Sequence, residues 1–405
     1  MQLPVIEQLI VKNDSKIVFL VMDGVGGLAK EGKGGTELQV AETPNLDALA
    51  AKSSCGTFDP VYPGITPGSG PGHFGLFGYD PLTSTIGRGV LAAAGIGFKL
   101  TEKDVAARIN FATSDANGNV TDRRAGRIGN DENKWVCEKL RQGIDLKDLG
   151  IEVFIETVKE HRAAVIFRGE NLSGDLEDTD PQKTGIPPKA PKATSADGER
   201  MISIVSAFIE QAQKILADEP KVNTVLLRGF AKFKPYKTME ERYGLKCLAI
   251  ANYPMYRGIA NILGMELHPI TVDIKTEFEA VRENLATYDF FFVHVKYTDS
   301  RGEDGDFDAK VKIIEEVDSL LPILTDLHPD VMVITADHST PAILASHSWH
   351  PVPALLHARN GLGRPDAETE FGECFCARGG LGRMPMKNII LEALATAEKI
   401  QKFGA

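Results

Sequence analysis

A set of acidic, imidazole and hydroxyl side chains in this sequence could together bind divalent metal ions and a phosphate group. Asp337 and His338 are adjacent, and His347 follows nine residues after His338. Asp299 and Glu303 are four residues apart and add two oxygen ligands. A mixed set of carboxylates and imidazoles suits manganese, tolerates zinc, cobalt or magnesium, and can hold two ions that clamp a transferring phosphoryl group. The candidate ligands for two divalent ions are Asp23, Ser69, Asp299, Glu303, Asp337, His338 and His347.

Ser69 is the candidate nucleophile, because it lies in the segment Gly64–Gly78, which reads GITPGSGPGHFGLFG. Glycine and proline at this density make tight turns, which can expose a serine hydroxyl to a substrate from several sides. A flexible surface loop is the alternative interpretation of the same composition. We expect a helix to begin near His73, and we favour a structural role for that histidine, such as capping, over contact with substrate.

Three short apolar runs are expected to form the buried strands that position these residues. They are Ile17–Met22, Phe290–Val295 and Val331–Thr335. A continuous apolar run is typical of a parallel strand that is covered on both faces. In each case candidate ligands follow within a few residues. Ligands bind outside the carboxyl ends of the strands in open α/β sheets, so we expect these three strand ends to form one site.

The rest of the chain predicts two domains. Helices are expected near both ends of the chain, at Thr43–Lys52, Pro254–Leu263, Lys310–Leu321 and Met386–Ile400. The middle of the chain differs, with strand-like runs at Thr101–Ala112, Val153–Arg168 and Val222–Arg228, an amphipathic helix at Ser195–Ala217, and loop composition over 172–196. We therefore predict an α/β core domain of residues 1–100 and 234–405, and a smaller inserted domain of residues 101–233.

Composition limits the kinds of partner. The 405-residue chain has 43% hydrophobic residues and a formal net charge of −11, which opposes nonspecific attraction to nucleic acid or anionic lipid. The first 14 residues lack a basic region and a small-residue cleavage site, and no window is apolar enough to span a membrane. We expect a cytoplasmic protein. Five cysteines without a C-x-x-C pair predict no disulfide framework, and Cys374 and Cys376 are expected on one face of a buried strand.

Several motifs resemble the alkaline phosphatase superfamily. These are the strand followed by Asp23 and glycines, the segment TPNLDALA from Thr43, the glycine-flanked Ser69, and TADH followed by His347 and PVP. A second set resembles one branch of that superfamily, the archaeal-type cofactor-independent phosphoglycerate mutases. This second set comprises FGYDP from Phe77, IGRG from Ile86, NFAT from Asn110, DRRAGR from Asp122 and ARGGLG from Ala377. The likeness covers nearly the whole chain.

The resemblance implies a fold and a reaction. The fold would be an alkaline-phosphatase-like core with a central, mostly parallel sheet flanked by helices, plus a smaller inserted α/β domain. The reaction would interconvert 3-phosphoglycerate and 2-phosphoglycerate without bisphosphoglycerate, in glycolysis and gluconeogenesis. Ser69 would attack the phosphate, glycerate would turn within the site, and its 2-hydroxyl would take the phosphoryl group back. The inserted domain would close to exclude water.

The resemblance also implies which residues bind the metals and the substrate. One ion would be held by Asp23, Ser69, Asp337 and His338, and the other by Asp299, Glu303 and His347. Glu303 departs from the family, in which many relatives have histidine at this position. Arginine suits bidentate recognition of phosphate and carboxylate, and the substrate-binding candidates of the inserted domain and its exit are Arg123, Arg127, Arg162 and Arg228.

Other functions remain open at this point. A phosphatase or phosphonate hydrolase of the same superfamily would use the same serine and metals and release phosphate to water. A phosphopentomutase would act on sugar phosphates. A metal-binding protein that has lost its activity is a further alternative, which the retained Ser69 and ligand set disfavour. The sequence does not decide the oligomeric state or the native metal.

Overall fold

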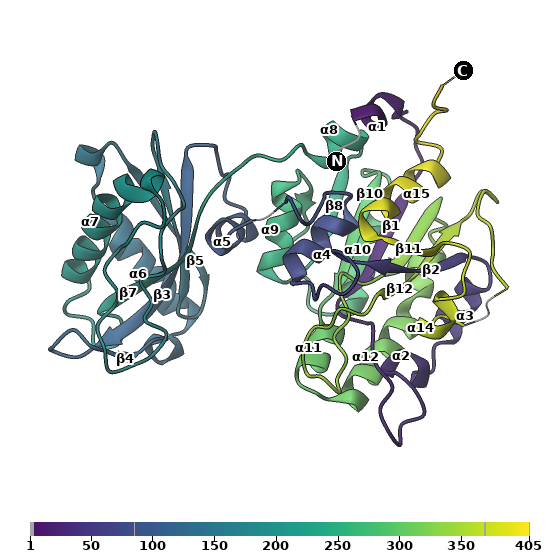
Figure 1. Ribbon diagram of the computed structural model, residues 1–405, viewed down its shortest axis with the longest axis horizontal. Helices are drawn as coiled ribbons and strands as arrows, with labels where there is room; N and C mark the ends of the chain where they lie inside the picture. Colours follow the sequence, from purple (N-terminus) through teal and green to yellow (C-terminus); the bar gives the residue numbers. More distant parts are fainter. Residues whose placement is uncertain (1–3, 85, 368–369, 405) are drawn as a thin grey trace. The chain divides into compact units, whose positions relative to one another are not determined.

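The computed structural model describes residues 4–84, 86–367 and 370–404, and it divides the chain into two compact units (Figure 1). The larger unit contains Met1–Thr85 and Lys237–Ala405, and the smaller unit is Ile86–Tyr236. The smaller unit begins earlier than residue 101 because helix α5 (Arg88–Gly95) packs on strands of the smaller unit. Gly89 makes this packing close, since a Cβ atom there would lie 2.2 Å from the carbonyl oxygen of Ala106.

The larger unit is built on an eight-stranded sheet in the order β13-β2-β12-β11-β1-β10-β8-β9. Only β12 runs against its neighbours among these strands, so the sheet is mostly parallel, as predicted. The strand bounds are β1 (Ile17–Met22), β2 (Ser54–Asp59), β8 (Cys247–Ile250), β9 (Glu266–Leu267), β10 (Phe290–Val295), β11 (Val331–Thr335), β12 (Val352–Ala358) and β13 (Gly382–Pro385).

The three strands predicted from apolar runs lie side by side at the centre of this sheet. Strand β1 pairs in parallel with β10 on one side and with β11 on the other. Every residue of the three strands is buried. This burial explains why their sequences read as continuous apolar runs without the alternation of a half-exposed strand.

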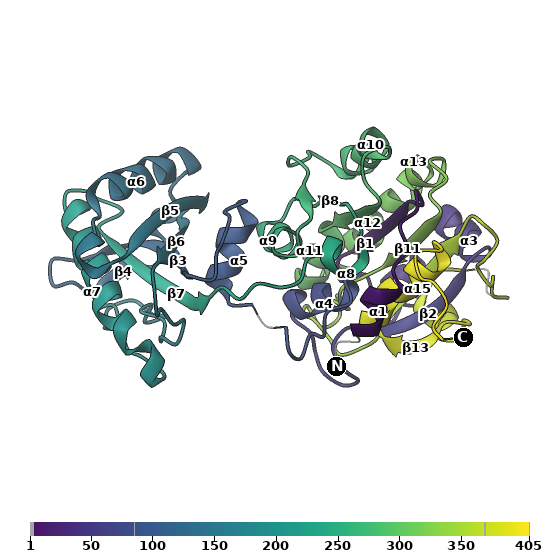
Figure 2. The same ribbon diagram turned by 90° about the horizontal axis from the view of Figure 1, so that it is seen from above.

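Helices cover both faces of this sheet, with α10 and α13 on one side and α4, α8 and α15 on the other (Figure 2). The principal helices of the larger unit are α1 (Pro4–Leu9), α2 (Glu37–Val40), α3 (Pro44–Ala50), α4 (Ser69–Leu76), α8 (Met239–Tyr243), α9 (Pro254–Ile262), α10 (Ile274–Asn284), α11 (Tyr297–Glu303), α12 (Phe307–Leu320), α13 (Pro322–Thr325), α14 (Glu373–Cys376) and α15 (Ile389–Thr396). Helix α3 begins as predicted at Pro44, but Thr43 makes no side-chain capping bond to the backbone.

The smaller unit is a second, antiparallel sheet with its own hydrophobic core. Strand β3 pairs with β6 and β7 along its length and with β4 near its end, while β5 pairs with β6. Helices α6 and α7 pack on this sheet, and their buried residues join the same apolar cluster as alternate strand residues such as Ile109 and Val165. The bounds are β3 (Asp104–Ser114), β4 (Val120–Asp122), α6 (Asn130–Gly143), β5 (Glu152–Lys159), β6 (Arg162–Arg168), α7 (Glu199–Ile215) and β7 (Thr224–Lys232).

Two sequence predictions are wrong in this architecture. Cys374 and Cys376 lie in the short helix α14 rather than in a strand, and Cys374 is exposed. Contacts distant in sequence hold this turn, because the half-buried Glu373 carboxylate accepts hydrogen bonds from the Gly27 N–H (2.8 Å) and the Thr36 hydroxyl (2.7 Å). The other error concerns Ser69, which is the first residue of α4, so this helix begins four residues before His73.

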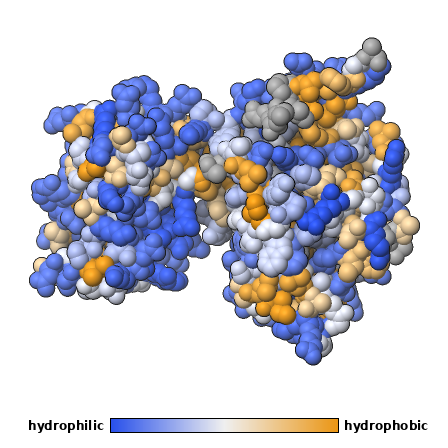
Figure 3. Space-filling view, viewed as in Figure 1, coloured by the Kyte–Doolittle hydropathy of each residue, from blue (hydrophilic) through white to orange (hydrophobic). Residues whose placement is uncertain are grey.

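The surface and the thiols agree with the composition. All five cysteines are free thiols, which confirms the absence of a disulfide framework. On the face shown in Figure 3 the smaller unit is mainly hydrophilic, while apolar patches are more extensive on the larger unit. Among the described residues, we find no helix with the length and apolar character of a membrane span.

Candidate active site

The carboxyl ends of the three central strands bring several of the predicted residues together. Met22 pairs with Val295 on β10, and Val21 pairs with Thr335 on β11. If both registers are extended beyond the strands, Asp23 lies beside Lys296 on one side and beside Asp337 on the other. The Asp23 N–H still donates to the Val295 carbonyl (3.0 Å), so Asp23 is held by the sheet itself.

The first cluster of candidate ligands consists of Asp23, Asp337 and His338, all fully buried. His338 Nε2 lies 3.2 Å from an oxygen of each of the two carboxylates. One ligand atom from each residue lies within 4.8 Å of the others, which is a spacing that one metal ion can bridge. The structure therefore brings together the three protein groups that the sequence assigned to one ion beside Ser69.

The second cluster consists of Asp299, His338 and His347. His347 Nε2 lies 3.6 Å from an Asp299 oxygen, and its ring stacks on that of His338 with the centroids 3.7 Å apart. Glu303 lies at the edge, with Oε1 3.8 Å from His347 Nε2 and 54% of its side chain exposed. His338 is thus common to both clusters, a sharing that the sequence prediction did not include.

Ser69 lies beside His338, the residue that the two clusters have in common. Its Oγ lies 3.3 Å from His338 Nε2, and it is buried, although we expected an exposed residue. Helix α4 approaches β11 closely because Gly72 has no side chain, and a Cβ atom there would lie 2.2 Å from the Asp337 carbonyl oxygen. The glycines of this segment therefore allow close packing of the helix that carries Ser69.

Lys296 and Tyr256 complete the surroundings of Asp23, and the sequence reasoning did not select either of them. Lys296 Nζ lies 3.1 Å from Asp23 Oδ2 and also contacts Asp299, so one ammonium group links the two clusters. The buried Tyr256 hydroxyl donates to Asp23 Oδ2 (2.6 Å). The position of Lys296 directly after β10 was the available signal, whereas nothing in the sequence near Tyr256 pointed to this contact.

His73 and His294 lie behind Asp23 and Asp337 and are both fully buried. His73 Nδ1 bonds the Ser69 carbonyl (2.8 Å) and lies 3.2 Å from Asp337 Oδ2. Its ring stacks on Tyr256 with centroids 4.5 Å apart. Burial lowers the pKa of His73 to about 4, so the imidazole is neutral at pH 7. This arrangement favours a structural role for His73, as we expected.

The carboxylates of the first cluster have raised pKa values in the absence of bound cations. Burial raises the pKa of Asp23 well above its usual value, and the neighbouring Asp337 charge adds to this effect. Burial, with a contribution from Asp299, raises the pKa of Asp337 to about 7. Burial lowers the pKa of Lys296, but Asp23 and Asp299 outweigh it and raise the pKa overall. Buried carboxylates of this kind require cations to remain ionised.

The donor set fits divalent metal ions. Among the described residues, Asp23 Oδ1 and Asp337 Oδ2 are buried carboxylate oxygens that form no hydrogen bond. Buried polar atoms are normally satisfied, so two such oxygens in one cluster indicate a ligand that binds them. Carboxylate oxygens, imidazole nitrogens and a serine hydroxyl together suit the borderline metals, including manganese and zinc.

The arginines predicted to bind substrate lie in the smaller unit. The face of its sheet opposite the hydrophobic core carries Arg162 on β6 and Arg228 on β7, with Arg108 of β3 as the register partner of Arg228. Arg123 forms a bidentate pair with the buried Asp180 (2.9 and 2.7 Å), and Arg228 Nη1 lies 3.4 Å from the same carboxylate. Two guanidinium groups therefore share Asp180, and Arg228 Nε also lies 3.5 Å from Asp178 Oδ2, so two carboxylates accompany these two arginines.

A second observation locates positive charge near Arg162 and Arg127. Burial, together with the charges of Arg162, Arg124 and Arg127, lowers the pKa of the buried His161 to about 4. Three guanidinium groups thus act on one imidazole, in a chain whose net charge is −11. The Arg162 Nε is buried and forms no hydrogen bond among the described residues. Unpaired donors of this kind suit an anionic ligand.

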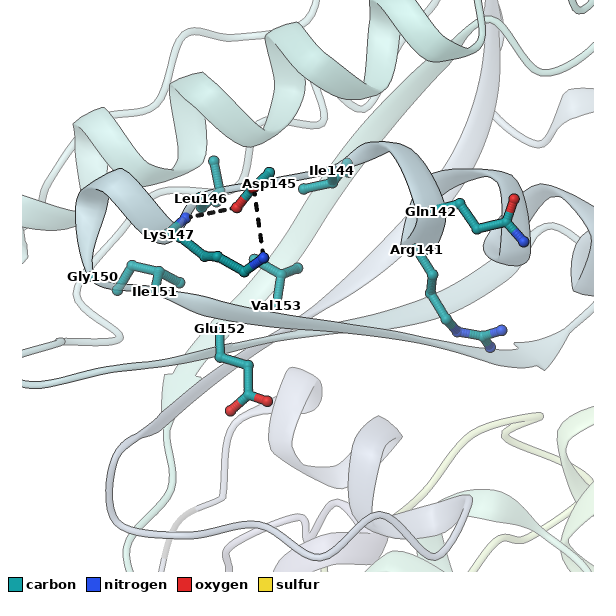
Figure 4. A pocket seen from close by; sticks show the side chains of 10 residues that line it. All are labelled: Arg141, Gln142, Ile144, Asp145, Leu146, Lys147, Gly150, Ile151, Glu152 and Val153. Atoms are coloured by element: carbon teal, nitrogen blue, oxygen red, sulfur yellow. Dashed lines mark hydrogen bonds and ion pairs between the residues drawn. The ribbon is translucent and has the colours of Figure 1, made fainter.

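A depression elsewhere on the smaller unit does not contain any of the predicted residues (Figure 4). It has a volume of about 590 Å³ and is lined by residues of the α6–β5 connection, Arg141–Val153 in part. Both of its cationic groups already have partners, since Arg141 pairs with Glu138 and Glu156, and Lys147 lies 3.8 Å from Asp145. We assign it no ligand.

Known proteins similar to this chain identify its family. A protein of Thermus thermophilus named "Probable 2,3-bisphosphoglycerate-independent phosphoglycerate mutase" is 48% identical over 406 residues, and the match covers 99% of each chain. A protein of the same name from Thermosipho africanus is 49% identical over 402 residues, which is 99% of this chain and 98% of the relative. The chain belongs to the 2,3-bisphosphoglycerate-independent phosphoglycerate mutase family. The characteristic pattern of this family of isomerases matches residues 50–223.

Solved structures confirm the fold class. A protein from Pyrococcus horikoshii superposes with a TM-score of 0.81 at 26% identity, covering 96% of this chain and 99% of that one. The cofactor-independent phosphoglycerate mutase from Thermoplasma acidophilum gives a TM-score of 0.76 at 26% identity, covering 95% and 100%. These matches, which cover nearly all of each chain, confirm the resemblance to the archaeal-type branch that the motifs indicated.

Proposed function

We propose that this chain interconverts 3-phosphoglycerate and 2-phosphoglycerate without bisphosphoglycerate, through a phosphoserine at Ser69 and with two divalent metal ions. The observation that carries the proposal is the position of Ser69 Oγ, 3.3 Å from Nε2 of His338, the residue that belongs to both ligand clusters. A nucleophile at the junction of two cation sites can attack a phosphorus atom whose oxygens those cations hold. Full-length relatives at 48–49% identity carry the name of this activity.

The metals would be held by the two clusters described above. Asp23, Asp337, His338 and Ser69 fit one ion. Asp299 and His347 fit the other, with Glu303 at the edge of this second cluster and His338 common to both. Bound divalent ions would supply positive charge that lowers the pKa of the Ser69 hydroxyl and neutralises the charge that develops on the phosphoryl oxygens. We propose manganese, because carboxylate oxygens outnumber imidazole nitrogens in this set.

The bonds that form and break in the reaction belong to Ser69 and the substrate. A bond forms between Ser69 Oγ and phosphorus while the bond from phosphorus to the 3-oxygen of glycerate breaks. The Ser69 hydroxyl gives up its proton, and the leaving 3-oxygen takes up a proton. Glycerate then turns so that its 2-hydroxyl attacks the phosphoserine and restores Ser69. Lys296, which already contacts both clusters, adds a third positive charge beside the reacting group.

We also propose that arginines of the smaller unit bind the phosphate and carboxylate groups of the substrate. Arg162 is the strongest candidate, because its Nε is buried without a hydrogen bond and its neighbours are also cationic. Arg123 pairs with Asp180, and Arg228 contacts both Asp178 and Asp180, so these two arginines are weaker candidates than Arg162. Arg127 is exposed in a left-handed turn at φ 53° that follows Gly126.

The test is an assay of purified, manganese-loaded protein with 3-phosphoglycerate and no bisphosphoglycerate, in which 2-phosphoglycerate and free phosphate are followed together. We expect 2-phosphoglycerate with little phosphate, and loss of this product in Ser69→Ala. Added ¹⁴C-glycerate should not enter the product, because the glycerate formed from substrate stays bound. Release of phosphate alone would instead identify a hydrolase.

A further inference from the structure

Lys310 is a buried cation outside the set of candidate ligands. It lies on α12, and its side chain has no exposed surface. Its ammonium group donates to three backbone carbonyls, those of Gly24 (2.9 Å), Gly26 (3.3 Å) and Thr340 (2.8 Å). A lysine is almost never fully buried without partners, and here its partners are the backbones of two different loops.

The two loops are those that carry the first cluster. Gly24 directly follows Asp23, and Thr340 lies two residues after His338. The Thr340 N–H also donates to the carbonyls of Gly24 and Gly26, at 3.1 Å each. The loops pack so closely that a Cβ atom on Gly24 would lie 2.5 Å from Thr340 Oγ1. Lys310 therefore cross-links the ends of β1 and β11 at the point where their ligands must converge.

Two acidic residues, Glu37 and Glu373, lie near Lys310, but its hydrogen bonds go to the loop carbonyls. Glu37 Oε1 lies 4.0 Å from Lys310 Nζ and accepts the Ala342 N–H (2.6 Å). Glu373 holds the Gly27 N–H at 2.8 Å. The ammonium is closer to the carbonyls than to either carboxylate, so its main contact is with the loops.

We infer that Lys310 is a positioning residue for the metal site, an internal cation that fixes Asp23 relative to Asp337 and His338. This inference rests on the proposed metal-dependent function. Without the ammonium, the carbonyl oxygens of Gly24, Gly26 and Thr340 would lose their shared donor. The Thr340 N–H would still bond Gly24 and Gly26, but the link from α12 to both loops would be lost, and the ligands that the loops carry would be held less firmly. Metal ligands must be held to within about 0.5 Å to bind well, and loss of a supporting group typically costs about 10–100-fold in metal affinity.

The test is the affinity of the protein for Mn²⁺, measured from the electron paramagnetic resonance signal of the free ion. The variant is Lys310→Met combined with Glu37→Gln, which removes the ammonium and the nearby Glu37 charge, and Glu37→Gln alone is the reference for the second change. The control is Lys399→Met, because Lys399 is also buried in the larger unit and donates to a backbone carbonyl, that of Asn13 (2.7 Å). Asn13 precedes β1, so this control lies at the strand end away from Asp23.

We expect the Lys310 variant to bind Mn²⁺ at least ~10-fold more weakly than the unchanged protein, while Lys399→Met keeps its affinity within about twofold although it also loses thermal stability. Unchanged affinity in a folded Lys310 variant would overturn the inference, and so would an equal loss in the control. If the unchanged protein binds no Mn²⁺, the proposed metal site fails instead, so the two failures are distinguishable. The electron paramagnetic resonance spectrum of bound Mn²⁺ gives a second readout. It reports the arrangement of ligands around the ion, which general destabilisation of the fold does not change.

Discussion

Lys296→Met should destabilise the metal-free protein much more than the metal-loaded protein. In the metal-free chain, Lys296 contacts the buried carboxylates of Asp23 and Asp299, with Asp337 close by. Removing one partner of a buried ion pair leaves an uncompensated charge and costs about 3–5 kcal/mol. Divalent ions bound to the same carboxylates would supply that charge, so the cost should be small once the metals are present.

This loss in the free energy of unfolding can be converted into a shift in melting temperature. For a unit of roughly 150–250 residues, 1 kcal/mol corresponds to about 2–4 °C, so we expect a loss of about 10 °C in EDTA. With saturating Mn²⁺ we expect a loss of less than about 3 °C. The measurement is made at pH 9, because the pKa of Asp337 is about 7 in the unchanged protein and would rise further without the Lys296 charge, and protonation of this carboxyl would relieve the repulsion.

Lys16→Met is the matched control for this experiment. Its side chain is 22% exposed, compared with 21% for Lys296, and it lies just before β1, at the other end of the strand from Asp23. Its effect on stability should be the same with and without metal. An equal loss for Lys296→Met in both conditions, or no loss in EDTA, would refute the reasoning.

Three further predictions concern protons, metal selectivity and substrate. Compared with Asp337→Asn, the metal-free protein should lose stability as the pH rises from about 4 to about 7, because burial raises the pKa of Asp337 to about 7 and the folded state then holds a proton that the unfolded state has released; the comparison cancels buried histidines such as His73, whose pKa of about 4 acts in the opposite direction, urea unfolding of both proteins in EDTA measures the difference, and a difference that does not change with pH would contradict it. Glu303→His should increase the affinity for zinc relative to manganese by ~10-fold, because imidazole is a softer ligand than carboxylate; competition dialysis of the two metals tests this, and an unchanged ratio would show that residue 303 is not a ligand. Arg162→Gln should raise KM for 3-phosphoglycerate by roughly 10–100-fold, the worth of a hydrogen bond to a charged group, without changing Mn²⁺ affinity; steady-state kinetics test this, and an unchanged KM would remove Arg162 from the substrate site.

The sequence predicted the parts of the site that depend on local pattern. The runs that form β1, β10 and β11 are continuous and apolar because the strands are buried on both faces, and polar residues begin where each strand ends. Parallel pairing then brings Asp23 and Asp337 together without further information. These features are encoded within a few residues of each ligand.

The remaining parts depend on contacts between distant segments. Tyr256 reaches Asp23 across 233 positions of sequence, and Lys310 reaches Gly24 across 286. No periodicity or spacing marks such residues, because their role follows from the packing of helices on the sheet. The start of the smaller unit at Ile86 was missed for the same reason, since α5 joins it through its contacts with β3, β6 and β7.

The most direct test of the central claim is to trap the intermediate on Ser69. The manganese-loaded protein is mixed with ³²P-labelled 3-phosphoglycerate, quenched in acid within milliseconds, digested and analysed by mass spectrometry. We predict radiolabel and one added phosphate on the peptide that contains Ser69, formed as fast as turnover and absent from Ser69→Ala. Turnover to 2-phosphoglycerate in Ser69→Ala, or label on another residue at the rate of turnover, would contradict the account.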